Sequence, residues 1–234
     1  MKRAFIIPGI LLGTLLAVQI LFHHIVVPVT IPLTPDMLPI IVIDPGHGGF
    51  DGGAVTGDVI EKEINLSVAL KLRDLMAVCG YPTVMTRESD ISTADSNPIG
   101  KSKKASDIHN RLALLESCGN AVFISIHQNK FHESRYSGAQ VFYSPNHPDS
   151  RLLAQKLQDR FRTLLQPDNT REIKQAGSEL YLMYHAQTPA ILAECGFLSN
   201  PQECRNLTTP EYQSRVALTI LSAAADYLYE TQRP

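Results

Sequence analysis

The chain has 234 residues, of which 44% are hydrophobic and 19% charged, and its formal net charge is −2. This balance is typical of one globular domain with an appendage, and it excludes a largely disordered chain. The 21 basic and 23 acidic residues leave no basic excess, so the composition argues against nucleic acid as a partner.

Residues 1–22 are predicted to be an N-terminal membrane anchor. Lys2 and Arg3 precede an uncharged, mostly apolar run, residues 4–22, which as a helix would be about as long as the hydrocarbon core is thick. The two cations favour a cytoplasmic N-terminus, so the rest of the chain is expected outside the cytoplasm. A cleaved signal peptide is the alternative, but residues 22–27 offer no small-residue cleavage site.

The remaining chain is predicted to comprise a stalk, residues 23–38, and one folded domain, residues 39–234. The stalk and the residue after it contain four prolines, which suit an extended segment rather than a helix. In the domain, apolar and β-branched runs predict strands, and longer amphipathic stretches predict helices. The predicted strands are 39–44, 83–86, 121–126, 139–144, 179–184 and 189–194, and the predicted helices are 63–78, 105–117, 148–165 and 210–229. Their alternation predicts an α/β fold in three layers, with a mostly parallel central sheet between helices.

Polar residues follow the apolar strands at the edge where open α/β sheets place their sites. His47 lies between glycines just after the first strand, and His127 ends the strand 121–126. Glu61 opens the first long helix, where an acidic residue is also expected simply because it complements the helix dipole. Two imidazoles and a carboxylate from separate elements match a catalytic zinc site with three protein ligands.

Glu194 follows the apolar residues 189–193, and a carboxylate there is costly to bury unless it is used. It is the candidate general base. The four cysteines show no metal-binding or redox spacing and are predicted to be small buried side chains. A bridge between Cys195 and Cys204 stays open for a domain outside the cytoplasm.

Several motifs follow one another between about residues 40 and 229, namely DPGHGG followed by D-x-GA, EKEINLSVALKL, TR-x-SD, SIHQN, GAQVFY and PAILAECGFLSNPQE. These motifs resemble those of the zinc-dependent N-acetylmuramoyl-L-alanine amidases of the Amidase_3 type. The resemblance is strongest for the short, membrane-anchored amidases that act on spore cortex. It implies hydrolysis of the amide between the lactyl group of muramic acid and L-alanine in peptidoglycan, with one Zn²⁺ per chain.

The resemblance also implies the role of each site residue. His47, Glu61 and His127 coincide with the family's zinc ligands, and Glu194 with its catalytic glutamate. Two further residues of the family pattern are expected to shape the site, namely Arg111 and Asn129. We therefore expect the protein in the cell envelope, on the forespore membrane, and we expect an accessory envelope protein as a further partner. A zinc carboxypeptidase acting on stem peptides and a wall-binding protein without activity are the alternatives.

Overall fold

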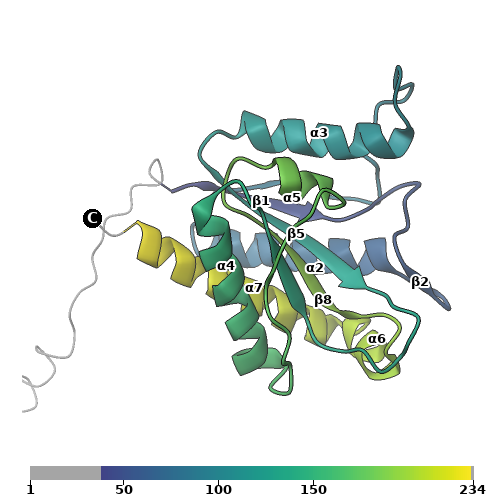
Figure 1. Ribbon diagram of the computed structural model, residues 1–234, viewed down its shortest axis with the longest axis vertical. Helices are drawn as coiled ribbons and strands as arrows, with labels where there is room; N and C mark the ends of the chain where they lie inside the picture. Colours follow the sequence, from purple (N-terminus) through teal and green to yellow (C-terminus); the bar gives the residue numbers. More distant parts are fainter. Residues whose placement is uncertain (1–37, 233–234) are drawn as a thin grey trace, which may run out of the picture. The chain divides into compact units, whose positions relative to one another are not determined.

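The computed structural model of the protein describes residues 38–232, and the predicted anchor and stalk lie outside them. The described residues form a single α/β domain (Figure 1). Among them, no helix combines the length and the apolar character that crossing a membrane requires. The strands are β1 (Ile40–Pro45), β2 (Val55–Thr56), β3 (Val59–Ile60), β4 (Thr83–Met85), β5 (Ala121–Asn129), β6 (Gln140–Tyr143), β7 (Lys174–Gln175) and β8 (Ala190–Phe197). The helices are α2 (Glu61–Val78), α3 (Lys103–Ser117), α4 (Pro148–Arg160), α5 (Tyr181–His185), α6 (Pro201–Leu207) and α7 (Pro210–Thr231).

The central sheet has six strands in the order β4-β1-β5-β8-β6-β7. Strands β4, β1, β5 and β8 pair in parallel, and β6 runs antiparallel to β8. The prediction of a mostly parallel sheet between helices is confirmed. A separate two-stranded hairpin, β2–β3, leads into α2, and the sequence analysis did not predict it.

Side chains alternate between the two faces of the sheet, as the two-residue period of a strand requires. In β5, Val122, Ile124 and Ile126 join the core under α2, α4 and α7, whereas Phe123 joins the core under α3 and α5. Figure 1 shows these helices on opposite sides of the sheet. The central strands are therefore buried on both faces, which explains their continuous apolar sequences.

Two predicted elements differ from the structure. The predicted strand 179–184 is wrong, because Tyr181–His185 forms the short helix α5. Its apolar residues 180–183 all pack towards the α3 side, and a run this short cannot be assigned to strand or helix by periodicity. The predicted helix 148–165 leaves the α-helical conformation after Arg160 and ends in a π-helical turn, Phe161–Leu165.

The cysteines of the domain are free, and no bridge joins Cys195 and Cys204. Cys195 is buried in the sheet and Cys204 is half-buried on α6. Burial raises the pKa of the Cys195 thiol above its ordinary value. The structure therefore agrees with the prediction that this cysteine is a packed side chain. For Cys79, which is exposed just after the end of α2, the prediction of a buried side chain is wrong.

Candidate metal centre and active site

The C-terminal ends of three neighbouring parallel strands, β1, β5 and β8, bring the candidate residues to one edge of the sheet. His47 lies two residues beyond the end of β1, and His127 lies near the end of β5. Glu194 on β8 is the register partner of His127. Residues separated by many positions in sequence thus become neighbours because parallel strands align their ends.

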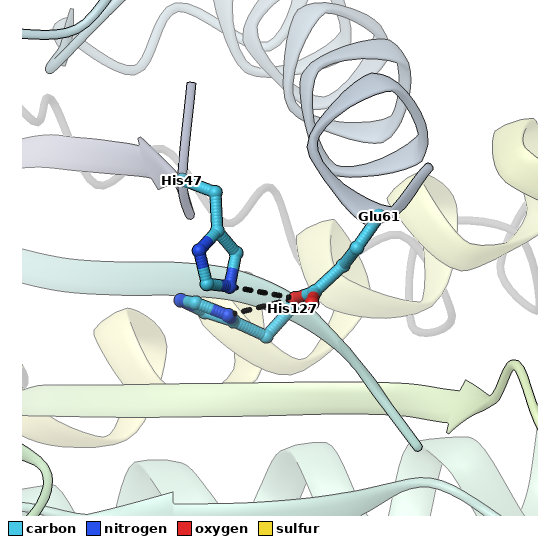
Figure 2. Close-up of side chains that lie close together, drawn as sticks. All are labelled: His47, Glu61 and His127. Atoms are coloured by element: carbon cyan, nitrogen blue, oxygen red, sulfur yellow. Dashed lines mark hydrogen bonds and ion pairs between the residues drawn. The ribbon is translucent and has the colours of Figure 1, made fainter. Parts of the chain in front are cut away.

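His47, Glu61 and His127 converge on one point, and Figure 2 shows their side chains turned towards one another. One nitrogen or oxygen from each lies within 4.8 Å of those of the other two. The Glu61 Oε1 atom is 3.2 Å from Nε2 of His47 and 2.9 Å from Nδ1 of His127. The two imidazole rings meet edge to face, with their centroids 4.8 Å apart.

Glycines around the cluster leave room for these side chains. A Cβ atom on Gly46 would lie 2.1 Å from Nε2 of His127, and one on Gly53 would lie 2.5 Å from Oε2 of Glu61. His47 has a φ of 62°, a left-handed conformation that is unusual for a residue with a side chain. The surrounding structure therefore holds this histidine in a strained turn, as is frequent at functional sites.

Glu61 is buried and is the first residue of α2. Its Oε2 accepts the backbone N–H of Ala54 at 2.8 Å, and its Oε1 accepts that of Gln128 at 3.1 Å. Burial opposes ionisation of this carboxyl, but His127 and His47 outweigh it and hold its pKa well below the ordinary value. Glu61 is therefore an ionised carboxylate, as a metal ligand must be.

The pKa of Glu194 is shifted in the opposite direction to that of Glu61. Burial, with a smaller contribution from the charge of Glu61, raises its pKa to about 7 against the opposing effect of the two histidines. Its Oε2 atom is buried and has no hydrogen-bond partner among the described residues. Buried polar atoms are nearly always paired in proteins, so this oxygen is free to bind a ligand or to take up a proton.

Of the two residues expected to shape the site, Arg111 reaches the loop that carries His47. Its side chain is 2% exposed, and its guanidinium lies 2.6 Å from Oδ1 of Asp44 and donates to the carbonyl oxygens of Pro45 at 3.0 Å and His47 at 2.6 Å. Asn129 contributes through its backbone, because its carbonyl accepts the N–H of Leu198 at 2.7 Å. Among the described residues, no hydrogen bond joins the Asn129 side chain to the three clustered residues.

The sequence analysis missed several residues that support the cluster. Asn65 donates to Oε1 of Glu61 at 3.2 Å, and Arg87 donates to the carbonyl oxygen of Gly46 at 3.0 Å. Asp51 lies 3.0 Å from Nδ1 of His47. A signal was available for Asn65, because residues four apart share one face of a helix. The D-x-GA and TR-x-SD motifs contained the other two.

A cavity of about 130 Å³ opens beside the cluster, on the face of the sheet that carries α3 and α5. Its lining includes His47 and His127. Side chains of α3, such as Ile108 and Arg111, form one wall, and residues 180–183 form another. A small, largely apolar space therefore adjoins the clustered nitrogens and oxygens.

Residues 41–226 match the family model Amidase_3, described as N-acetylmuramoyl-L-alanine amidase. The germination-specific N-acetylmuramoyl-L-alanine amidase of Bacillus subtilis is 40% identical over 196 residues, which cover 83% of this chain and 82% of that protein. The amidase LytC of the same organism is 25% identical, and the match covers 80% of this chain and 35% of LytC.

Solved structures agree with these sequence matches. The CwlD amidase of Clostridioides difficile, solved in complex with the GerS lipoprotein, superposes with a TM-score of 0.78 at 36% identity, covering 82% of this chain and 99% of that one. An N-acetylmuramoyl-L-alanine amidase from Clostridium difficile 630 superposes with a TM-score of 0.72 at 27% identity, covering 84% and 99%. The three-layer fold described above is thus shared with enzymes of this kind.

Proposed function

The chain belongs to the Amidase_3 family of N-acetylmuramoyl-L-alanine amidases, and from this premise we propose that it acts on spore-cortex peptidoglycan through one zinc ion. The bond it hydrolyses joins the lactyl group of muramic acid to L-alanine. Its similarity to a germination-specific amidase supports the choice of cortex as substrate. The observation that carries the proposed site is the convergence of His47, Glu61 and His127 on one point, with Glu194 beside His127 on the next strand.

The donor set fits zinc. Two imidazole nitrogens and one carboxylate oxygen are the ligand types of a catalytic zinc site that keeps its fourth position for water or substrate. We assign these three ligands to His47, Glu61 and His127. When bound, zinc supplies a Lewis acid for a carbonyl oxygen and lowers the pKa of water towards neutrality.

The role assigned to Glu194 follows from its environment. With a pKa raised to about 7 and an unpartnered buried oxygen, this carboxyl is suited to both accepting and donating a proton near neutral pH. It accepts the proton of the water that attacks the lactyl carbonyl carbon. It then donates that proton to the nitrogen of L-alanine as the carbon–nitrogen bond breaks.

Arg111 and Asn129 shape the site without touching the reacting atoms. Arg111 holds the backbone on both sides of the turn through Pro45 and His47. Asn129 ties the end of β5 to the segment after β8 through Leu198. Both therefore fix the relative positions of the strands that carry the proposed ligands and base.

We propose that residues 39–234 are the catalytic domain, held outside the cytoplasm by the anchor 1–22 and the stalk 23–38. The charge pattern of the first 22 residues supports this arrangement. Determining the N-terminus of the protein in the membrane fraction tests it, because a chain that starts after residue 22 would indicate a cleaved signal peptide. The complex of CwlD with a lipoprotein supports the further proposal that an accessory envelope protein binds this domain.

Digestion of purified peptidoglycan tests the activity. The full chain in detergent, stripped with a chelator and then supplied with zinc, is incubated with cortex and with vegetative peptidoglycan. We expect free stem peptides with a new L-alanine amino terminus, a faster reaction on cortex, and none without metal. Shortened peptides still attached to muramic acid would identify a carboxypeptidase instead, and equal rates on both substrates would remove the cortex preference.

A further inference from the structure

His47 faces a carboxylate on each of its two ring nitrogens. On one side, Nε2 lies 3.2 Å from Oε1 of Glu61, within the cluster. On the other side, Nδ1 lies 3.0 Å from Oδ2 of Asp51. Asp51 belongs to the D-x-GA motif, but it has no role in the mechanism proposed above. A nitrogen that binds a metal ion carries no proton, and a carboxylate only accepts hydrogen bonds. With an ion on Nε2, the nitrogen facing Asp51 is therefore the one that carries the proton and donates to it.

Asp51 is itself held in place by four contacts. Its backbone exchanges two hydrogen bonds with Gly48, at 2.9 Å and 3.1 Å, which close the turn after His47. Its Oδ1 accepts the N–H of Gly53 at 3.2 Å, and its Oδ2 lies 3.2 Å from Nζ of Lys104 on α3. The carboxylate therefore has a fixed direction, and a cation from another element of the fold stabilises it.

Both histidines of the cluster lie against glycines and are equally exposed, at 18% of the side chain. A Cβ atom on Gly46 would come within 2.1 Å of Nε2 of His127, and one on Gly53 within 2.6 Å of Cδ2 of His47. The two rings differ at the nitrogen that faces away from Glu61. For His47 this nitrogen is Nδ1, and Asp51 is the carboxylate that the structure places beside it.

We propose that Asp51, held by Lys104, is the positioning residue that keeps the proton of His47 on Nδ1 and directs the lone pair of Nε2 into the cluster. Histidine ligands of metals commonly donate their second N–H to a carboxylate in this way, and losing that partner typically weakens metal affinity by about 10- to 100-fold. The inference rests on the proposed zinc site, because Nε2 is the atom that would bind the ion.

The first test needs no variant. In zinc-loaded wild-type protein labelled with ¹⁵N-histidine, the chemical shifts of the His47 nitrogens report which one carries the proton and which one binds the ion. We expect the proton on Nδ1 and the ion on Nε2. An ion on Nδ1 would overturn the inference, because Asp51 would then face a nitrogen without a proton.

The second test measures zinc affinity by competition with a chromogenic chelator, using the full chain. We expect Asp51→Ala to weaken binding by about 10- to 100-fold, and Asp51→Asn to retain more of it because the amide oxygen still accepts a hydrogen bond. Lys104→Met should weaken binding less than Asp51→Ala. Asp58→Ala removes an exposed acid seven positions along the same segment and should leave zinc affinity unchanged.

The outcomes separate this inference from the proposal on which it rests. If wild-type protein binds zinc but folded Asp51→Ala binds it equally well, the positioning role is wrong and the zinc site stands. If wild-type protein binds no zinc, the proposed site itself fails. If Asp51→Ala does not fold, the histidine shifts of the wild type and of Asp51→Asn still decide the question.

Discussion

Two polar clusters lie within a few residues of each other at the end of β1, and they differ in how completely their atoms are paired. The buried ion cluster, named here for its ion pairs, consists of Asp44, Thr86, Asp107, Arg111 and Ser125. Both carboxylate oxygens of Asp44 have donors in it, from Thr86 at 2.7 Å, Arg111 at 2.6 Å and Ser125 at 2.6 Å. The second cluster, called the zinc cluster because we propose that it binds zinc, consists of His47, Glu61 and His127 with Glu194 beside it. It leaves Oε2 of Glu194 without a partner among the described residues.

This difference indicates which cluster is structural and which is chemical. A buried network whose donors and acceptors are all paired fixes the backbone around it and leaves no free donor or acceptor for a ligand. An unpaired buried atom beside converging ligand atoms is costly in the folded state and is expected at functional sites. Changes in the buried ion cluster should therefore affect stability, and changes in the zinc cluster should affect metal content or rate.

The largest effect is expected for His47→Ala. One of three proposed ligands is removed, so the purified variant should contain almost no zinc, whereas the wild type should contain about one ion per chain. Metal analysis by mass spectrometry measures this directly. His132→Ala, which changes an exposed histidine of the loop after β5, is the control and should keep its zinc. Full zinc content in His47→Ala would exclude the proposed ligand set.

The next largest effect is expected for Arg111→Met, in stability. Asp44 is 1% exposed, and removing its cation leaves a buried charge without compensation, at a cost of about 3–5 kcal/mol in the free energy of unfolding. Denaturant titration measures this loss. Arg73→Met breaks a partly exposed ion pair with Glu88 and should cost less than about 1 kcal/mol. Equal losses in the two variants would show that the buried ion cluster is not the structural element we describe.

Glu194→Gln should separate rate from stability. Removing the proton acceptor should lower the hydrolysis rate by at least about 100-fold, while zinc content stays at the wild-type level. Because the replaced carboxyl has a buried oxygen without a partner, the free energy of unfolding should not fall. A variant that keeps its rate would remove Glu194 from the mechanism, and one that unfolds more easily would place it with the structural residues.

The sequence was sufficient to predict the parallel strands and the polar residues that follow them. Apolar runs such as 121–126 identify buried strands, and parallel pairing then makes neighbours of the residues that follow them. The convergence of His47, Glu61 and His127 could therefore be predicted, and the structure brings them together. Their assignment as zinc ligands stays a prediction.

What the sequence could not reveal depends on contacts between distant segments. Nothing local distinguishes residues 180–183 from a strand, because packing against α3 decides their conformation. Asp44 could be placed at the end of β1, but its burial with Arg111 follows only from the position of α3 over the sheet. Asp51 belonged to a visible motif, yet its direction towards Nδ1 of His47 depends on the left-handed turn at that histidine.

The smallest effect is expected for pH, and it should arise from the buried ion cluster. Burial opposes ionisation of Asp44 and Asp107, but Arg111 and neighbouring hydroxyl groups outweigh it, so the pKa of each carboxyl is lowered. A pKa that is lower in the folded state contributes stability above the unfolded value, near 3.8, and this stability is lost as the pH falls through the folded value. The free energy of unfolding should therefore decline in acid below about pH 4.

Substitution by asparagine identifies the carboxyl responsible for this decline. In Asp107→Asn the dependence of unfolding free energy on pH should be flatter by up to about 1.4 kcal/mol per pH unit, the value for one proton. Asp58→Asn, at an exposed position outside the buried ion cluster, is the control and should retain the wild-type slope. Denaturant titrations of metal-free protein between about pH 6 and about pH 3 give the slopes. If the wild type and the two variants share one slope, the acid sensitivity lies outside the buried ion cluster. The ion pairs of that cluster would then not contribute to stability in the way we describe.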